Sequence, residues 1–334
     1  MAATRGRRSP VLLVVGATMT VAALIAGVAL TLSDDGPDDH ANASPPATAN
    51  SASTQPTRPT TGPTAKPTPT RPAMSPYPGN TGVPVGWSPK RTVNGDLTVR
   101  KSGQVVEDYL VKGSVIVAAA NVTIRRTQVA GGQITNDVNG RCNNGLVIED
   151  TSVTPPVGQD RSNGGTSGVI GPGGYTARRV KITNREEGFR VGGRNVGCGK
   201  VVIESSFARI VPPQPCGDWH GDGVQGYDGP ALTVRNLTVD FVETGACGGT
   251  AAFFYPDGQG NTSVTIDGLL VKGGGYPFRL GTPGKVSNLM IVKDSWGYGP
   301  MEVSCGRVSA WSARLVTVDA NYQPRTVRSQ PCTR

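Results

Sequence analysis

VTIRRTQV, residues 122–129, is the first of eight similar phrases in the last two-thirds of the chain. The others begin at Leu146 (LVIEDTSV), Tyr175 (YTARRVKI), Val201 (VVIESSFA), Leu232 (LTVRNLTV), Val264 (VTIDGLLV), Lys285 (KVSNLMIV) and Trp311 (WSARLVTV). Successive copies start 21 to 32 residues apart, a spacing typical of stacked-repeat proteins. Within each copy apolar residues alternate with polar ones, which indicates a half-buried β-strand. The repeat therefore predicts an all-β solenoid of short parallel strands, because only stacking lets such units bury their apolar side.

The phrase HGDGVQ, which begins at His220, recurs in secreted bacterial β-helix proteins. Together with the repeat, it resembles the right-handed parallel β-helix of the pectin-lyase-like superfamily over about residues 90 to 334. The resemblance implies a right-handed parallel β-helix of about eight to nine coils that acts on or binds a polysaccharide. The Asn-Thr-Asp, Asp-Asp, Gly-His-Gly and Arg-Ile-Lys phrases of polygalacturonase-like members do not occur within residues 79–334, and the calcium-binding aspartate cluster of pectate lyases is not recognisable.

A second strand follows each repeat and predicts which side chains face outward. The aligned segments are EGFRVG from Glu187, DGVQGY from Asp222, TAAFFY from Thr250, YPFRLG from Tyr276 and GPMEVS from Gly299. Phe189, Val224, Ala252, Phe278 and Met301 are expected to face inward, and Arg190, Gln225, Phe253, Arg279 and Glu302 outward, because successive strand side chains alternate. We therefore expect a mostly polar substrate-binding row, roughly 19 Å long, which suits about four sugar units.

The ends of the chain indicate export. A basic stub and an apolar run from Val11 to Leu32, long enough to span a bilayer, predict a signal-anchor or signal peptide over residues 1–32. Residues 33–78 hold 11 of the 27 prolines and predict a disordered linker, which leaves residues 79–334 for the β-helix domain. We expect an extracellular or cell-surface protein, secreted or held in the membrane by residues 11–32 if they are not cleaved.

The charge balance favours an acidic partner. From residue 86 onward the chain has 27 Lys and Arg against 20 Asp and Glu. An extended basic surface suits an acidic polysaccharide or another cell-wall glycan, although solubility alone also explains the excess. The sequence contains none of the usual nucleic-acid-binding motifs, so no nucleic-acid partner is expected.

All six cysteines lie outside the predicted cytoplasmic stub, and their even number predicts disulfides. Cys216 and Cys247 each follow their repeat by eight residues, so they are expected to pair between adjacent coils. Cys305 and Cys332 follow theirs by 13 and 14 residues and pair by the same logic. Cys142 and Cys198 remain; they are two coils apart, so their pairing requires a loop that closes the gap.

The candidate catalytic residues lie around His220, because this segment concentrates an imidazole and two carboxylates beside the predicted row. His220, Asp218, Asp222 and Glu187 are the candidates, with Glu187 expected at the same place in its coil as Asp222. Asp218 and Asp222 are also the candidate ligands of a cation such as Ca²⁺. Trp219, Tyr227 and Tyr255 are expected to offer aromatic faces to sugar rings.

Three functions fit these residues. The first is β-elimination on a uronate polysaccharide, with His220, Arg190 or Arg279 as the base and a cation on Asp218 or Asp222. The second is glycoside hydrolysis by two carboxylates drawn from Glu187, Asp218 and Asp222. The third is a wall-bound adhesin or glycan-binding rod without chemistry. The sequence favours cleavage over binding alone, with a pectate-lyase-like reaction first.

Overall fold

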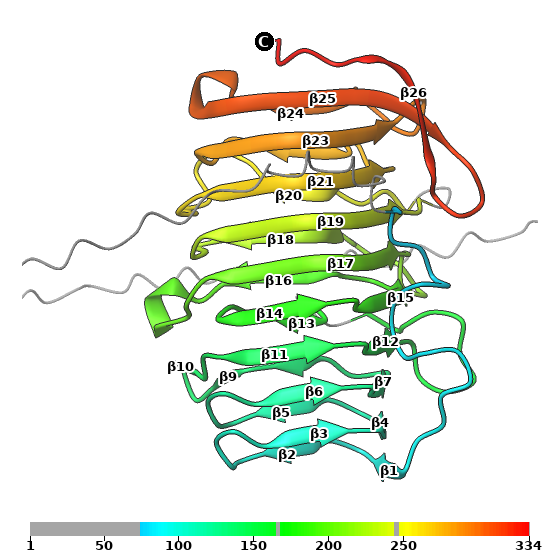
Figure 1. Cartoon of the computed structure of the whole chain (residues 1–334), viewed down its shortest axis with the longest axis vertical. Helices are drawn as coiled ribbons and strands as arrows, with labels where there is room; N and C mark the ends of the chain where they lie inside the picture. The colour runs from blue at the N-terminus through cyan, green and yellow to red at the C-terminus, as the bar shows by residue number, and fades with distance from the viewer. Residues whose placement is uncertain (1–73, 165–167, 244–246, 334) are drawn as a thin grey trace, which may run out of the picture. The chain divides into compact units, whose positions relative to one another are not determined.

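A computed structural model describes residues 74–164, 168–243 and 247–333 of the chain (Figure 1). The predicted segment 1–32 and nearly all of the linker 33–78 lie outside these residues. Among the described residues, no helix has the length and apolar character needed to cross a membrane.

The chain forms two parallel sheets whose strands follow one another in sequence order, which confirms a parallel β-solenoid (Figure 1). Sheet B has nine strands: β2 (Leu97–Val99), β5 (Val115–Val117), β8 (Ile134–Thr135), β13 (Ile170–Gly171), β16 (Phe189–Gly192), β18 (Asp222–Tyr227), β20 (Ala251–Tyr255), β22 (Phe278–Leu280) and β24 (Met301–Val303). Nine strands agree with the expected eight to nine coils. The described residues contain no α-helix, only the short 3₁₀ helices η1 (Arg194–Val196) and η2 (Cys305–Arg307).

Sheet A contains the repeated phrases. Its strands are β1 (Arg91–Asn94), β3 (Val105–Glu107), β4 (Tyr109–Lys112), β6 (Thr123–Arg125), β7 (Gln128–Ala130), β11 (Leu146–Glu149), β12 (Ser152–Thr154), β14 (Tyr175–Arg178), β15 (Lys181–Arg185), β17 (Val201–Ile210), β19 (Leu232–Phe241), β21 (Val264–Lys272), β23 (Gly284–Val292), β25 (Val308–Val318) and β26 (Pro324–Ser329). The last pair, β25 and β26, is antiparallel, and a small antiparallel hairpin joins β9 (Asp137–Val138) to β10 (Arg141–Cys142).

The third residue of each phrase points into the core. Ile124, Ile148, Ala177, Ile203, Val234 and Ile266 lie one above another in register, and each is fully buried. They join the inward residues of sheet B in one hydrophobic cluster. This column explains the alternation seen in the sequence, since a buried residue every second position places the polar residues between them outside.

The fifth residue of each of the first six phrases forms a sharp corner. Arg126, Asp150, Arg179, Ser205, Asn236 and Gly268 all have φ between 44° and 82°. The left-handed conformation bends the chain in the middle of each phrase, which is why sheet A consists of paired short strands in its first coils. Asn and Gly at this place fit the bend with least strain.

The fourth residue of each phrase forms a ladder of alternating charge on the outer face of sheet A. The charge ladder consists of Glu107, Arg125, Glu149, Arg178, Glu204, Arg235 and Asp267, each paired in register with the next. Within it, Arg125 Nη2 lies 2.8 Å from Glu107 Oε2 and Arg178 Nε lies 3.1 Å from Glu204 Oε2. Arg235 Nη1 lies 2.5 Å from Glu204 Oε1. Every charge in the ladder thus has a neighbour of opposite sign.

Three details of the repeat differ from the prediction. Trp311, expected as the first residue of its copy, pairs with Val286 and so stands at the third position, and β25 has no corner residue. The copy expected at Lys285 begins at Gly284, which pairs with Val264, so Asn288 rather than Leu289 is its corner residue. In addition, an earlier copy begins at Gln104, because Val105 pairs with Thr123 and Asp108 has the corner conformation. In both segments apolar and polar residues alternate imperfectly, which leaves the start of the phrase ambiguous by one residue.

Three disulfides join the predicted pairs, two of them predicted from spacing and Cys142–Cys198 as the pair that remained. They are Cys142–Cys198, Cys216–Cys247 and Cys305–Cys332, with Cα separations of 5.0, 6.0 and 5.8 Å. The β9–β10 hairpin carries Cys142 and closes the two-coil gap to Cys198. Three disulfides are typical of proteins that fold in an oxidising environment, in most cases outside the cell.

Candidate functional site

The outer face of sheet B carries the predicted row, with one change of register. Arg190 pairs with Gln225, Gln225 with Phe254, Phe254 with Arg279, and Arg279 with Glu302. We call these five residues the outer row. Arg190 donates a hydrogen bond to Gln225 Oε1, and Arg279 forms an ion pair with Glu302. Four of the five side chains are those that the sequence places together.

The remaining residue of the row differs from the prediction: Phe254 faces outward, whereas Phe253, which was expected there, faces the core. Phe253 is fully buried and its ring centroid lies 5.1 Å from that of Phe278. The same shift places Tyr255 in the interior, fully buried against Phe253, so it offers no face to a sugar. The segment AAFFY is apolar on both faces, and a slip of one residue exchanges them.

Aromatic rings lie beside both arginines of the outer row. The guanidinium of Arg279 lies 5.0 Å from the ring centroid of Phe254, and that of Arg190 lies 5.6 Å from the ring of Tyr227. Tyr227 is 56% exposed, as expected for a residue that contacts a ligand. Such cation–π contacts hold a guanidinium in place while its N–H groups still point to solvent or to a ligand.

Glu187 and Asp222 form a carboxyl pair at the edge of the outer row. Their two coils stack in register, and the Asp222 N–H donates to Glu187 Oε2 at 3.2 Å. The Ala251 N–H of the next coil donates in turn to Asp222 Oδ1 at 3.2 Å. Asp222 is 1% exposed, and its Oδ2 is buried without a hydrogen-bond partner among the described residues. Glu187 is less deeply buried.

The surroundings of the carboxyl pair favour its protonated form. Burial raises the pKa of Glu187 to about 9, and the neighbouring Asp222 carboxyl adds to the rise against the opposing effects of the Asp222 amide and Arg190. Burial likewise raises the pKa of Asp222 well above its usual value, although the Ala251 amide, Arg190 and Arg279 oppose this. The pair therefore holds at least one proton at neutral pH.

A buried ion pair precedes the carboxyl pair and fixes the loop above it. Arg185 and Glu186 are 1% and 2% exposed, and Arg185 Nε lies 3.1 Å from Glu186 Oε2. Arg185 also donates to the Gly132 carbonyl at 2.5 Å. Trp219 Nε1 donates to the Glu186 carbonyl at 2.9 Å, and the Trp219 ring stacks on Phe241. One face of Trp219 is thus occupied by protein, which reduces what it can offer to a sugar.

The side chains of His220 and Asp218 are exposed to solvent, unlike those of the carboxyl pair. Their side chains are 74% and 97% exposed, and His220 Nε2 lies 3.1 Å from Asp218 Oδ1. The two therefore pair with each other in solvent, whereas Asp222 is enclosed. The sequence brings His220 and Asp222 within two residues, but the strand start at Asp222 directs its side chain into the fold.

The proposed cation ligands do not converge. Asp218 is exposed and pairs with His220, whereas Asp222 is buried and accepts a hydrogen bond from Ala251. Within the described parts of the chain, no group of three or more His, Cys, Asp or Glu residues is placed to hold a metal ion. Because Ca²⁺ takes six to eight oxygen ligands, this donor set does not fit the expected calcium site.

A depression continues the outer row toward the first coils. It has a volume of about 220 Å³ and is lined by Thr135, Asp137, Gly171, Arg190 and their neighbours. A Cβ at Gly171 would lie 2.7 Å from Cβ of Arg190, so the glycine makes room for the arginine. The predicted row did not include this part of the face. Aligning the GVIG segment (168–171) with the row places Gly171, which has no side chain, beside Arg190.

A second cavity, of about 1030 Å³, lies on the other sheet. It is lined by Met74, Arg235, Asp267, Arg314 and other residues of sheet A and of the chain ends. Its charged residues belong in part to the charge ladder, where they are already paired. We therefore place the candidate site on sheet B, where Arg190 and Arg279 lie beside the carboxyl pair, and not in this cavity.

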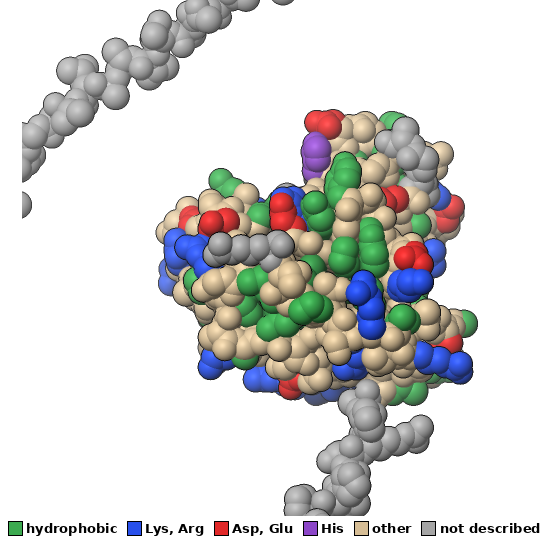
Figure 2. Space-filling view, turned by 90° about the horizontal axis from the view of Figure 1, so that it is seen from above, with side chains coloured by type: hydrophobic (Ala, Val, Ile, Leu, Met, Phe, Trp, Pro, Cys, Tyr) green, Lys and Arg blue, Asp and Glu red, His purple; other side chains and the backbone are tan. Residues whose placement is uncertain are grey.

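On the face seen from above, Lys and Arg side chains lie in several separate groups with Asp and Glu among them (Figure 2).

No known protein family, curated protein or solved structure matches this chain.

Proposed function

We propose that this protein binds an acidic polysaccharide along the outer row of sheet B and cleaves it at the carboxyl pair. The observation that carries the proposal is the position of Glu187 and Asp222, two carboxyl groups whose pKa values are raised by burial, beside Arg190 and Arg279. Buried carboxyl groups of this kind are typical of acid–base catalysis.

The arginines supply recognition. Arg190 and Arg279 stand on the same row, three strand steps apart, or roughly 14 Å at the usual strand spacing. A guanidinium binds a carboxylate through two parallel N–H donors, which suits the carboxylates of a uronate chain. Phe254 and Tyr227 offer apolar surface to the sugar rings between them.

Glu187 is the proposed general acid, because it is the less buried member and carries a proton at neutral pH. It donates that proton to the glycosidic oxygen as the bond from this oxygen to the anomeric carbon breaks, with the electron pair going to oxygen. A water molecule bonds to the anomeric carbon and passes its proton to the carboxylate of the pair. This is hydrolysis, and it replaces β-elimination as the leading reaction since His220 is solvent-exposed and the cation ligands do not converge.

Three further properties belong to the same proposal. The coils are right-handed, as nearly all parallel crossovers are, and the chain is a member of the pectin-lyase-like superfamily, which the stacked parallel strands and the HGDGVQ phrase support. The protein acts outside the cell or at its surface, as the disulfides suggest. Residues 11–32 attach it to the membrane unless they are cleaved.

The test is an assay of the full chain against polygalacturonate, alginate, glycosaminoglycans and wall polymers. We expect new reducing ends without the ultraviolet absorbance of an unsaturated uronate; that absorbance would instead identify a lyase. Glu187→Gln is expected to lower the rate by roughly 10²–10⁴-fold, with polymer binding retained. Glu149→Gln, a carboxyl of the charge ladder, is the matched control. Full activity of Glu187→Gln would show that the carboxyl pair is not the catalytic site.

A non-catalytic glycan-binding rod is the second candidate, and the enclosure of Asp222 favours it. Asp222 Oδ1 accepts the Ala251 amide, so this carboxyl also has a purely structural use at the start of β20. Retention of the polymer without any new ends, in every polymer that binds, would support the rod.

A further inference from the structure

A cavity of about 550 Å³ lies on the outer face of sheet B in the first coils. We call it the hairpin cavity; it is lined by Thr98, Arg100, Ile116, Ala118, Val138, Asn139, Arg141 and Asn143. Thr98 and Ile116 are outward residues of β2 and β5, paired in register, and form its floor. The β9–β10 hairpin supplies the opposite wall. The volume lies within the range of ordinary ligand pockets.

The charges of the hairpin cavity are positive and unpaired. Arg100 and Arg141 are exposed, and neither forms an ion pair or a hydrogen bond within the described residues. No Asp or Glu lines the cavity. This differs from the charge ladder, in which each arginine has a carboxylate in register beside it. The hairpin cavity is therefore complementary to an anion.

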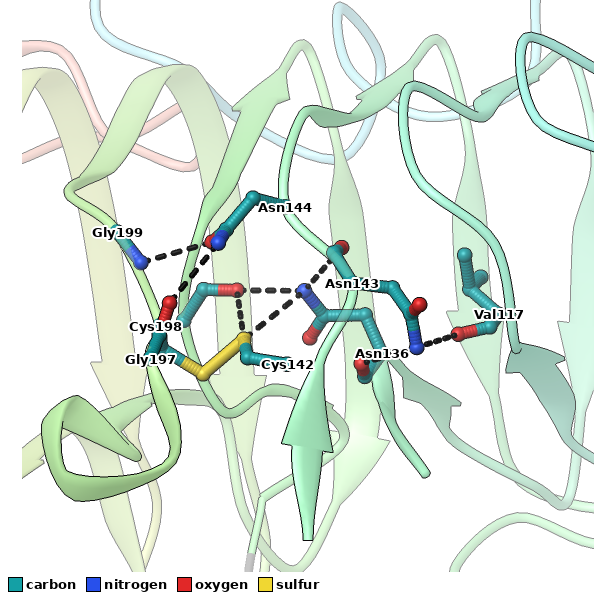
Figure 3. The surroundings of a disulfide bond; sticks show 9 residues. Val117, Asn136, Cys142, Asn143, Asn144, Gly197, Cys198 and Gly199 are labelled. Carbon is teal, nitrogen blue, oxygen red and sulfur yellow. Dashed lines mark hydrogen bonds between the residues drawn. A yellow bond between two sulfur atoms is a disulfide. The ribbon is translucent and has the colours of Figure 1, made fainter. Parts of the chain in front are cut away.

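The hairpin that carries Arg141 is held firmly at its base (Figure 3). Cys142 is bonded to Cys198, and Asn136 Nδ2 donates to the Gly173 carbonyl at 2.6 Å. Asn143 Nδ2 donates to the Val117 carbonyl at 3.1 Å, which ties the hairpin to β5. A wall fixed in this way loses little conformational freedom when a ligand binds, so its contacts contribute more fully to affinity.

We propose that the hairpin cavity is an anion-binding subsite for the carboxylate or sulfate group of an acidic polysaccharide, an inference that rests on the proposed function. Arg100 and Arg141 bind the anionic group, and Ile116 and Ala118 contact the apolar face of the sugar that bears it. Ile116 stands on the same outer column as Arg190, three strand steps or about 14 Å away. One polymer chain can therefore occupy the hairpin cavity and the outer row together.

The test compares two double variants of the full chain with the same loss of charge. Arg100→Gln/Arg141→Gln removes the cations of the hairpin cavity, and Arg325→Gln/Arg328→Gln removes two exposed, unpaired arginines of β26. Affinity is measured for polygalacturonate, which carries carboxylates, for heparin, which adds sulfates, and for duplex DNA. We expect a loss of roughly tenfold for the first variant and less than about twofold for the second. The first variant is also expected to show a weaker dependence of affinity on salt.

Each outcome supports or contradicts either the subsite or the proposed function. A loss seen with polygalacturonate identifies carboxylate recognition, and a loss seen with heparin alone identifies sulfate recognition. Equal losses in the two double variants, or wild-type binding to DNA as tight as to either glycan, would overturn the subsite. If the wild-type chain retains neither glycan, the proposed function fails and the subsite with it; if it retains one and the hairpin variant binds equally well, only the subsite fails.

Discussion

The outer faces of the two sheets use charge in opposite ways. On sheet A, the charge ladder places each Arg beside a Glu or Asp of the neighbouring coil. On sheet B, Arg190 faces Gln225 and Tyr227, and Arg279 lies over Phe254 although it also pairs with Glu302. The carboxyl groups nearest Arg190 are buried. The comparison indicates that the charges of sheet A act within the fold, whereas the arginines of sheet B lie beside polar and aromatic neighbours and belong to the site proposed above.

The carboxyl groups of the two faces also differ in proton affinity. Burial tends to raise the pKa of Glu204 in the ladder, but hydrogen bonds from Arg178 and Arg235 outweigh it and hold the pKa below its usual value. Burial dominates at Glu187, where the pKa rises to about 9. At neutral pH Glu204 on sheet A is thus ionised, whereas Glu187 on sheet B is protonated.

The largest expected effect concerns two adjacent phenylalanines of β20. Phe253→Ala empties a fully buried site between Phe278 and Tyr255 and is expected to cost about 3–5 kcal/mol of unfolding free energy. Phe254→Ala, on the outer face, is expected to cost less than about 1 kcal/mol and to weaken glycan binding, because Arg279 loses its aromatic neighbour. Thermal unfolding and a binding assay measure both. Equal destabilisation by the two variants would contradict the register of β20.

The next effect is a loss of stability as the pH rises from about 4.5 to about 9. Between the usual pKa of 4.5 and about 9, folded Glu187 keeps a proton that the unfolded chain has released. Unfolding free energy therefore falls as pH rises through this window, by up to about 1.4 kcal/mol per pH unit. Glu187→Gln is expected to remove this part of the slope, as measured by denaturant unfolding at several pH values. An unchanged slope would show that Glu187 titrates normally.

A smaller effect is expected from a reversed charge in the ladder. Arg178→Glu places a third carboxylate between those of Glu149 and Glu204 and is expected to cost about 1–2 kcal/mol, because these side chains are partly exposed. The cost should shrink in high salt. Arg325→Glu, at an exposed and unpaired arginine, is the control for thermal unfolding. If the two variants melt alike, the ladder does not stabilise the stack.

The smallest effect has the opposite pH dependence to that of Glu187. The lowered pKa of Glu204 contributes stability above its unfolded pKa, and this contribution is lost as pH falls through the folded value. Glu204→Gln is expected to reduce the acid-induced loss by less than about 1 kcal/mol, since the carboxylate is partly exposed. The unfolding free energies of the variant and the wild type are compared in mildly acidic solution. If both lose the same stability in acid, Glu204 does not contribute to acid sensitivity.

The sequence predicted the fold well because the buried third residue repeats in nearly every phrase. It predicted two of the three disulfides because strand stacking turns equal spacing along the chain into proximity, and Cys142–Cys198 was the pair that remained. It failed at Phe253 and Tyr255, where both faces of the strand are apolar and alternation gives no signal. The start of the Lys285 copy shifted by one residue for a similar reason.

The candidate site was predicted in part. Alignment alone put Glu187 and Asp222 in adjacent coils, and the structure keeps them there. Their burial could not be predicted, because it depends on how neighbouring coils pack around them; the Ala251 N–H of the next coil, for example, donates to Asp222 Oδ1. The hairpin cavity joins strands and a hairpin that share no motif, so the sequence contains no pattern that marks it.

The alternating ladder also limits how such a protein can change its length. Excision of one coil would bring two like charges together, for instance Glu149 against Glu204 if the coil with Arg178 were lost. Excision of two neighbouring coils would restore opposite signs at the junction. Growth and shortening of the solenoid through gene duplication or deletion should therefore proceed in steps of two coils along this stretch, with odd steps disfavoured by electrostatic repulsion.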